Sequence, residues 1–352
     1  MEKSLKNGSI ARAVPRLDAL MDQEKPLRIL AGILARGDIP HAFLFTGIDG
    51  IGKRSAAMGF AMACNCLAAV QETSPQVPVP GDGVLPFCGD CRLCRAIAAG
   101  THPDMITIAP EGNAIKIGRI RDLIEKVAFR PHEARMRAVI VSDAWAMNPE
   151  AANALLKSLE EPPPQTLFFL TAEHASDLLP TVVSRCRHIR FAPVSADRIE
   201  AFLRQHHGVD EKTARSAALM SGGSVARALA LTDVPLGAWR QWLAAELAAL
   251  PSRPVPLVLA FAEKLQKNKD QVGQWLGMIQ ACLYDAVVWK YQPGRIMNID
   301  MADAVAALSD QESIASLGRK IDAVVAVEKA LDRNVNPRLA TEKLALELAN
   351  RL

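Results

Sequence analysis

Aromatic residues and long apolar runs are both scarce in this 352-residue sequence. Phe, Trp and Tyr make up 5% of it, and few rings beside abundant Ala and Leu favour helix-rich packing over a β-sandwich. No apolar run approaches the roughly 18 residues that span a bilayer. The first residues are charged and lack an apolar stretch of signal-peptide length, so we expect a cytoplasmic protein.

The sequence also lacks a strong charge of either sign. It carries 41 Lys and Arg against 38 Asp and Glu, a formal net charge of +3, and neither half is markedly basic. Any contact with nucleic acid must therefore come from a local patch or from partner proteins. At about 150 residues per domain, the length predicts two or three domains.

Short apolar runs alternate with helical stretches from residue 13 to residue 192. The clearest runs are Ala42–Thr46, Met105–Ile108, Ala138–Ser142 and Thr166–Thr171. They are continuous and do not alternate with polar residues, which is typical of strands covered by helices on both faces. The alternation of strands and helices predicts an α/β core with a parallel sheet.

The remaining segments have different patterns. Residues 1–12 are polar and predict a flexible tail, and Gln71–Pro86, rich in Pro, Gly and Val, predicts a loop. From residue 193 onward the pattern is helical. A boundary near residue 234 separates a small helical region at 193–233, which has an internal break at Ser221–Ser224, from a larger helical region at 234–352.

A glycine-rich turn follows the first apolar run. Gly47, Gly50 and Gly52 lead to Lys53 at the start of a helical stretch, which is the order of a phosphate-binding loop. Glycines let backbone N–H groups turn toward phosphate oxygens, and Lys53 would reach the outer phosphates. Arg54, however, occupies the place of the Ser or Thr that ligates Mg²⁺. The pattern indicates a phosphate loop of reduced competence; a strand-to-helix turn without a ligand is the alternative.

A second half of a nucleotide site follows the apolar run at Ala138–Ser142. Asp143 ends this run as in a Walker B strand, where the carboxylate helps to hold Mg²⁺. Ala144 then replaces the Glu that polarises the attacking water in such ATPases. The alternative is a buried strand that ends in a helix-capping Asp. Together, Arg54 and Ala144 indicate a site that has lost hydrolysis.

Five of the seven cysteines lie close together in the sequence. Cys88, Cys91 and Cys94 have the spacing of tetrahedral zinc ligands, and a closed site needs one more. Cys64, Cys66 and, less favourably, His102 are the choices for that fourth ligand. Free surface thiols are the alternative, since the sequence alone holds no further signal for metal.

Two arginines, Arg185 and Arg227, have either a structural or a functional role. Arg185 follows the segment Leu178–Val183 and could form an ion pair within its own chain or project toward a neighbour's phosphate. Arg227 follows Gly222 and Gly223 at the start of a helix. It is either a solvated helical side chain or a sensor that leans over a nucleotide.

Taken in order, these motifs resemble the AAA+ clamp-loader subunits of bacterial DNA polymerase III. The resemblance extends over nearly the whole chain from Ile39. Besides the phosphate loop and the cysteines it rests on Gly100–Asp104, Asn153–Pro163, Leu178–Cys186 and Asn336–Ala340. The motor subunits of this family keep Ser or Thr after the loop lysine and Glu after the strand-ending Asp. Because this sequence has Arg54 and Ala144 at those positions, it is more similar to the delta-prime, or stator, group.

The resemblance implies an AAA+ P-loop core at 13–192 with a zinc module at 66–94, a helical lid at 193–233 and a helical collar at 234–352. It implies a structural zinc ion held by Cys66, Cys88, Cys91 and Cys94, with Cys64 left over. Arg185 becomes an arginine finger offered in trans to a neighbouring motor subunit. Gly47, Gly50, Gly52, Lys53, Asp143 and Arg227 form a degenerate nucleotide site, in which ATP binding stays open and hydrolysis is not expected.

The implied function is to support ATP-dependent loading of the sliding clamp onto primed DNA. The implied partners are motor and delta subunits in a five-subunit ring of the DNA polymerase III holoenzyme. One alternative is an autonomous P-loop ATPase, which the residues at positions 54 and 144 disfavour. Another is a zinc-containing DNA-binding protein with a vestigial ATPase fold, which the near-zero net charge disfavours.

Overall fold

The computed structural model of the chain describes residues 20–70, 85–112, 114–232, 236–266, 272–298, 301–332 and 335–351. They form two compact units. The first comprises the described residues of Met1–Arg198 and Gly223–Arg227, and the second those of Ile199–Gly222 and Ala228–Leu352. No helix among the described residues is long and apolar enough to cross a membrane.

Two predicted segments fall largely outside this description. The tail predicted at residues 1–12 and the loop predicted at Gln71–Pro86, except for Leu85 and Pro86, lie outside the described residues. The division of residues 193–352 into a lid at 193–233 and a collar at 234–352 stays a prediction.

Five parallel strands form the sheet of the first unit, in the order β2-β3-β4-β1-β5. They are β1 (Ala42–Thr46), β2 (Met105–Ile108), β3 (Arg137–Val141), β4 (Thr166–Ala172) and β5 (Arg187–Arg190). The predicted parallel sheet is confirmed, as are its first four strands. The sequence pattern does not predict β5, because Ile189 alone among its residues is buried.

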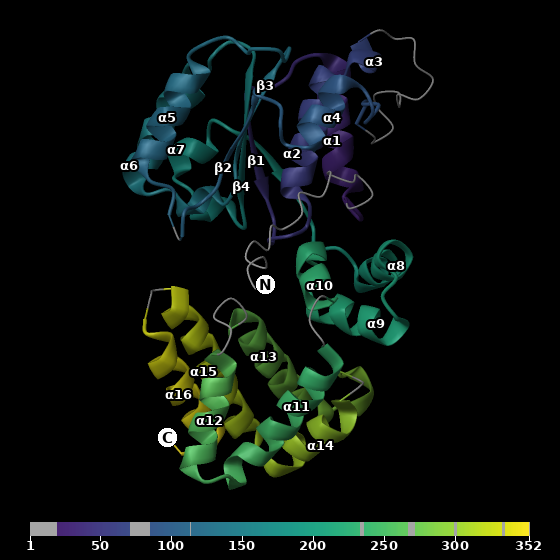
Figure 1. The fold of residues 1–352 in the computed structure, drawn as a ribbon, viewed down its shortest axis with the longest axis vertical. Helices are drawn as coiled ribbons and strands as arrows, with labels where there is room; N and C mark the ends of the chain where they lie inside the picture. The colour runs from purple at the N-terminus through teal and green to yellow at the C-terminus, as the bar shows by residue number, and fades with distance from the viewer. Residues whose placement is uncertain are drawn as a thin grey trace, which may run out of the picture. The chain divides into compact units, whose positions relative to one another are not determined.

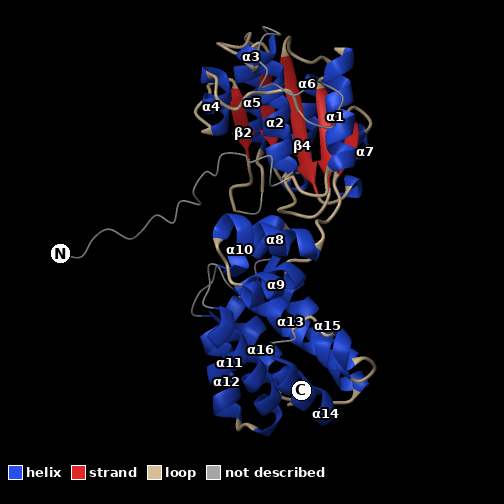
Figure 2. Ribbon diagram, turned by 90° about the vertical axis from the view of Figure 1, so that its right-hand side faces the viewer, coloured by secondary structure: helices blue, strands red, loops and turns tan. Residues whose placement is uncertain are grey.

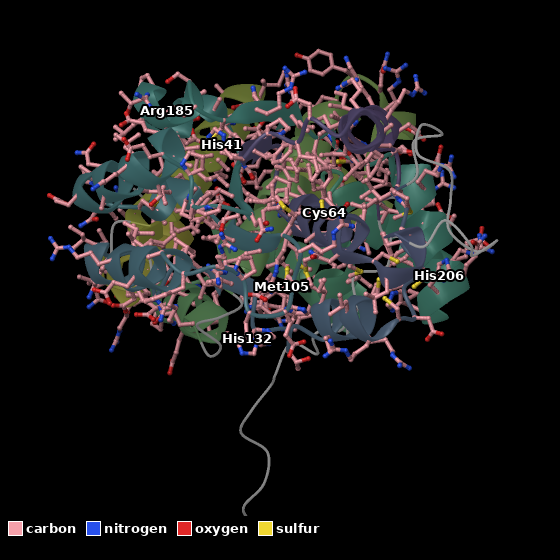
Figure 3. The ribbon with its side chains drawn as sticks, turned by 90° about the horizontal axis from the view of Figure 1, so that it is seen from above. His41, Cys64, Met105, His132, Arg185 and His206 are labelled. Carbon is pink, nitrogen blue, oxygen red and sulfur yellow. The ribbon has the colours of Figure 1, made fainter. Side chains whose placement is uncertain are left out.

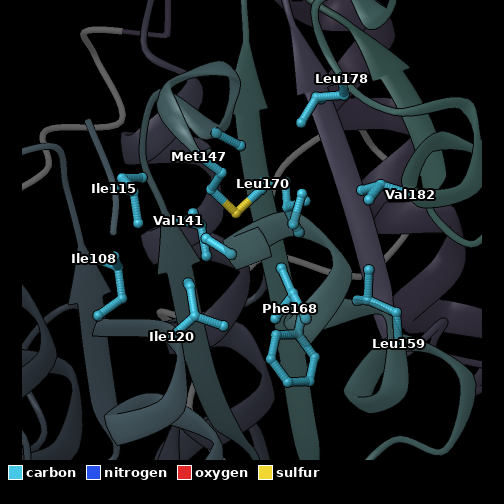
Figure 4. Close-up of a cluster of buried hydrophobic side chains, with 14 of the residues drawn as sticks. Ile108, Ile115, Ile120, Val141, Met147, Leu159, Phe168, Leu170, Leu178 and Val182 are labelled. Carbon is cyan, nitrogen blue, oxygen red and sulfur yellow. The ribbon is translucent and has the colours of Figure 1, made fainter. Parts of the chain in front are cut away.

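Helices cover both faces of this sheet (Figures 1 and 2). The helices of the first unit are α1 (Glu24–Arg36), α2 (Lys53–Asn65), α3 (Leu67–Val70), α4 (Arg92–Ala98), α5 (Ile117–Val127), α6 (Pro149–Glu160) and α7 (Pro180–Val183). On one face Leu44 and Phe168 pack toward α5, α6 and α7 (Figure 4). On the other, Phe43 and Phe169 stack at 5.2 Å in the core that α1 and α2 complete. Since successive strand residues point to opposite faces, both must be apolar, which explains the continuous runs.

Helices are the regular secondary structure found among the described residues of the second unit, joined by loops (Figure 2). The helices from residue 196 onward are α8 (Ala196–His207), α9 (Glu211–Met220), α10 (Val225–Thr232), α11 (Leu236–Ala249), α12 (Val255–Gln266), α13 (Val272–Trp289), α14 (Ala302–Gln311), α15 (Ile314–Asp332) and α16 (Pro337–Leu348). The first residues of α8 and α10 belong to the first unit. Within the second unit, α12 packs against α16, and α13 packs against α14 and α15.

Candidate functional site

The glycine-rich turn lies between β1 and α2, at the carboxyl ends of the strands. Gly47, Gly50 and Gly52 have φ values of 141°, 75° and 99°, in the region that favours glycine. A Cβ atom on Gly47 would lie 2.5 Å from the side chain of Ile51, and one on Gly50 would lie 2.3 Å from Ser224 Oγ. Gly47 and Gly50 are therefore required for two reasons: their backbone conformation favours glycine, and neighbouring atoms leave no space for a Cβ atom.

Lys53 begins α2 and is buried. Its Nζ donates hydrogen bonds to the carbonyl oxygens of Gly47 at 2.6 Å and Ile48 at 2.8 Å. Burial lowers the pKa of Lys53, and the nearby carboxylates of Asp49, Asp143 and Glu173 oppose that shift. The ammonium thus lies inside the loop, bonded to the loop's own carbonyls. Arg54, the next residue, is exposed.

Asp143 is the second residue after β3, close enough to Lys53 for each charge to affect the pKa of the other. Burial raises the pKa of Asp143, Asp49 adds to the shift, and Lys53 opposes it. The Asp143 side chain makes no capping hydrogen bond to the short helix that follows, so capping does not account for it. Ala144 is buried and offers no proton acceptor.

Glu173 is a member of this site that the sequence motifs do not single out. It follows β4, the strand between β1 and β3. The order of the strands could therefore have predicted that Glu173 lies near Lys53 and Asp143, at the carboxyl ends of the strands. Its charge acts on both Lys53 and Asp143. Glu173, Asp49 and Asp143 thus place three carboxylates near Lys53, and their charge would repel that of a triphosphate.

The turn before α10 lies directly against the phosphate loop. The N–H of Ala226 donates to the carbonyl of Gly50 at 3.2 Å. Ser224 Oγ accepts the N–H of Arg227 at 3.1 Å and so caps α10. Arg227 is exposed one residue beyond this contact. The structure therefore brings the start of α10 against Gly50 of the phosphate loop. That Arg227 shares one nucleotide site with Gly47, Gly50, Gly52, Lys53 and Asp143 stays a prediction.

Four cysteine sulfurs form a second cluster. The Sγ atoms of Cys66, Cys88, Cys91 and Cys94 all lie within 4.8 Å of one another, and those of Cys66 and Cys88 are 3.6 Å apart. A tetrahedral zinc site with Zn–S distances of about 2.3 Å requires sulfurs roughly 3.8 Å apart, so the arrangement fits zinc.

Backbone N–H groups support the same cluster. The N–H groups of Cys88, Cys91 and Cys94 point at Cys66, Cys88 and Cys91 sulfurs, respectively, at 3.3 to 3.5 Å. Burial would raise the pKa of Cys91, but N–H donors from Cys94 and Leu67 outweigh it and bring the pKa to about 7. The thiolate, which is the metal-binding form, is therefore favoured at Cys91, whereas burial and the neighbouring Cys91 side chain raise the pKa of Cys94.

Neither of the other two choices for a fourth ligand belongs to this cluster. Cys64 lies in α2 and packs in the core beneath the sheet, where burial raises the pKa of its thiol to about 12. His102 is buried, and its Nδ1 accepts the N–H of Asp104 at 3.1 Å. Cys66 is the first residue beyond α2 and has an extended backbone conformation. That change of direction turns its sulfur toward Cys88.

Arg185 follows α7 and is partly exposed. Its guanidinium donates to the Thr181 carbonyl at 2.9 Å and forms an ion pair with Glu160 at 2.5 Å. Glu160 ends α6, so the segments Asn153–Pro163 and Leu178–Cys186 meet at this pair. Figure 3 shows Arg185 on the opposite side of the molecule from Met105 and His132.

Comparisons with known proteins identify the family of this chain. A family model described as DNA polymerase III, delta subunit, matches residues 22–195, and one for the C-terminal part of that subunit matches residues 240–350. The delta' subunit of Escherichia coli K12 is 34% identical over 64% of this chain and 67% of its own length. The chain belongs to the delta-prime family of DNA polymerase III subunits. The predicted α/β core with a parallel sheet, followed by helical regions, is confirmed.

Two further relatives show how far the similarity extends. The delta' subunit of Bacillus subtilis 168 is 29% identical over 93% of this chain and 96% of its own length. The tau subunit of Escherichia coli K12 is 32% identical, but over 61% of this chain and 32% of its own length. The similarity to delta' thus extends over nearly the whole chain, whereas the similarity to tau covers part of it.

Proposed function

We propose that this chain acts as the delta-prime, or stator, subunit of a clamp loader and supports ATP-dependent loading of a sliding clamp onto primed DNA. It joins motor and delta subunits in a five-subunit ring in the cytoplasm. Residues 234–352 form the collar that joins the ring, and residues 193–233 form the lid. Similarity to delta' subunits over nearly the full chain supports this role.

The observation that carries the stator role is the buried Ala144 beside Asp143. A methyl group at this position cannot orient a water for attack on a phosphate. Arg54 adds a second defect, because a guanidinium cannot ligate Mg²⁺. The chain keeps the loop geometry at Gly47, Gly50 and Gly52, with Lys53 inside it, and lacks the groups for turnover. The proposed role requires no hydrolysis in this chain's own site.

Arg185 is the residue we assign to chemistry in a neighbouring subunit. Its pair with Glu160 is partly exposed, and such pairs contribute little to folding. Glu160 and the Thr181 carbonyl instead orient the guanidinium at the surface. A planar, permanently charged fork of donors suits a terminal phosphate whose charge grows during transfer.

Cys66, Cys88, Cys91 and Cys94 would hold one structural zinc ion. Four thiolates leave no open position for substrate, so the ion would supply local stability and no chemistry. It would tie the end of α2 to α4, since Cys66 follows α2 and Cys94 lies in α4.

Reconstitution tests the proposed function. Motor and delta subunits are combined with or without this chain, and the transfer of a labelled clamp to primed DNA is measured. We expect loading to require the chain, and the isolated chain to show no ATPase activity. Full loading without the chain would contradict the proposal. Tight, salt-dependent binding of primed DNA by the isolated chain would favour the DNA-binding alternative.

A further inference from the structure

A pocket of about 570 Å³ lies on the first unit, in a region that neither the phosphate loop nor the cysteine cluster uses. Its floor is the segment from Pro103 to Thr107, and its walls include Lys126, His132, Glu133 and Arg137. The floor contains most of β2, which is the outermost strand at one edge of the sheet. Met105 and His132 are seen on the same side of the molecule in Figure 3.

The backbone of β2 is open on the side of the pocket. The carbonyls of Asp104 and Ile108 accept N–H groups of Ala138 and Ser142, on the β3 side. Because successive residues of a strand direct their backbone groups to opposite sides, Met105 and Thr107 direct theirs away from β3. Met105 N–H donates to the His102 carbonyl at 3.1 Å. The N–H and C=O groups of the exposed Thr107 are thus turned outward, in the arrangement that pairs with an added strand.

The outer wall of the pocket is rigid. The Asp104 carboxylate accepts the N–H groups of His132, Glu133 and Ala134 at 2.7 to 2.9 Å. The Arg137 guanidinium donates to the Phe129 and Arg130 carbonyls at 2.7 and 2.9 Å. The buried side chains of Asp104 and Arg137 therefore hold the segment from Phe129 to Ala134 in place. A ligand would not have to order this segment on binding.

Lys126 gives the pocket an exposed cation. Asp104 is neutralised by Arg137 at 3.4 Å and by the three N–H donors. The Glu133 carboxylate is bonded to Arg92 at 2.8 Å. Lys126 and His132 are exposed at the rim. A carboxylate side chain on the ligand would complement Lys126.

We propose that the β2 edge binds an extended, acidic peptide segment of a partner protein, which adds as a sixth strand and places a carboxylate against Lys126. Backbone pairing with Thr107 would supply affinity, and the pocket would select the side chains. This binding site is separate from the phosphate loop and from Arg185, so it does not depend on the stator role.

The test uses the full-length protein and a fluorescein-labelled peptide, Thr-Val-Asp-Val-Glu-Val-Asp-Val-Thr, followed by fluorescence anisotropy. We expect saturable binding that weakens about tenfold in Lys126→Glu, since one favourable charge pair becomes a repulsive one. Lys157→Glu is the matched control, because Lys157 is exposed in the last turn of α6 as Lys126 is in the last turn of α5. This control should bind like wild type.

Two further probes separate strand pairing from simple charge attraction. Replacing the central residue of the peptide by proline should abolish binding, because proline cannot donate to a ladder. Thr107→Pro in the protein should do the same while the sheet stays folded, since an edge strand tolerates proline where the N–H faces outward. Equal binding of the proline peptide, equal weakening by Lys157→Glu, or no saturable binding would overturn the proposal. Lys126-dependent binding of an oligodeoxythymidylate in place of the peptide would also overturn it.

Discussion

At the scale of single residues, Cys64 and Cys66 show how an offset of two positions changes the environment of a thiol. Cys64 is still helical and packs toward the aromatic core under the sheet. Cys66 lies just past the end of α2, in an extended conformation, and packs with Cys88, Cys91 and Cys94. The spacing of the last three cysteines predicted a metal site from sequence alone. The fourth sulfur depended on where α2 ends, and helix ends are poorly determined by sequence.

The first prediction concerns the metal content of purified protein, measured by atomic emission against protein concentration. We expect about one Zn²⁺ per chain, as in other closed four-ligand sites. Cys66→Ser, like Cys94→Ser, should lose the metal and loosen the region around α4, because metal binding and local folding are coupled. Cys64→Ser should retain it, since its sulfur lies outside the cluster. Metal lost from Cys64→Ser and kept by Cys66→Ser would show that the ligand set is wrong.

The second prediction concerns hydrolysis by the isolated chain. Phosphate release should stay at background with ATP and Mg²⁺, because Ala144 cannot orient water and Arg54 cannot ligate the metal. The double variant Arg54→Thr, Ala144→Glu restores both groups but still lacks a finger from a neighbour, so it should gain nucleotide binding at most. Lys53→Ala serves as the control for contaminating ATPases. Mg²⁺-dependent turnover by wild type that disappears in Lys53→Ala would contradict the stator role.

At the scale of elements, the central strands were predictable from sequence and the edge strand β5 was not. β1, β3 and β4 are covered by helices on both faces, so every residue is buried and apolar runs mark them. β5 contains Arg187, His188 and Arg190, which are exposed, and its place is set by pairing with β1. The pairing with β1, and not the local sequence pattern, thus makes Arg187–Arg190 a strand.

The loop between α5 and β3 depends on a buried pair from two different elements. Asp104 precedes β2 and Arg137 begins β3, and both are buried. Between them they bond three N–H groups and two carbonyls of the segment that joins α5 to β3, and Arg137 also bonds a carbonyl in the last turn of α5. The sequence places Asp104 in the motif Gly100–Asp104 but does not predict its hydrogen bonds, because the N–H groups that it accepts lie about 30 residues further along the chain.

The third prediction follows from that pair. Asp104→Ala leaves Arg137 buried without its counter-charge, which typically costs about 3–5 kcal/mol of unfolding free energy. Urea unfolding followed by circular dichroism measures it. Asp90→Ala is the control, since Asp90 pairs with Arg95 at 3.8 Å with both side chains largely exposed, and it should change stability by less than about 0.5 kcal/mol. Equal small effects of both variants would show that the buried pair does not support the loop.

The same pair has a defined pH dependence. Burial alone would raise the pKa of Asp104, but N–H donors from Ala134, Glu133 and His132 and the charge of Arg137 hold it below its ordinary value. A carboxyl group whose pKa is lower in the folded state stabilises the fold above its unfolded pKa, about 3.9, and this contribution is lost as the pH falls through the folded value. The stability gap between wild type and Asp104→Ala should therefore be constant from pH 5 to 7 and shrink below about pH 4.

At the scale of the whole molecule, the proposed stator role links two features: a phosphate loop with Arg54 and Ala144 at positions where a hydrolysing site needs other residues, and Arg185, which lies apart from that loop. Arg185 is on β5's side of the sheet, after α7, whereas Lys53 and Asp143 lie at the carboxyl ends of β1 and β3. In a ring, each subunit can complete the site of the next, which is the arrangement that the stator role requires.

The last prediction tests that use of Arg185 in the assembled ring. Arg185→Ala should leave assembly intact by gel filtration and lower DNA-stimulated ATPase and clamp loading. Fingers contribute roughly 10³–10⁵ in rate in other phosphoryl-transfer systems, so the one motor site that Arg185 serves should stop while the remaining sites continue. Arg185→Lys should restore little, because a point charge does not replace the guanidinium fork. Arg187→Ala is the control, since Arg187 is exposed two residues further on.

Glu160 distinguishes a finger from a structural ion pair. Glu160→Gln removes the charge that Arg185 contacts and keeps the guanidinium. If Arg185 acts on a neighbour's phosphate, Glu160→Gln should keep most ring ATPase activity while Arg185→Ala does not. If the pair is structural, both variants should lose the same stability and assembly, and any complex that still forms should hydrolyse ATP normally. That second pattern would remove Arg185 from the chemistry of the ring, because its effect would then pass through the fold of its own chain.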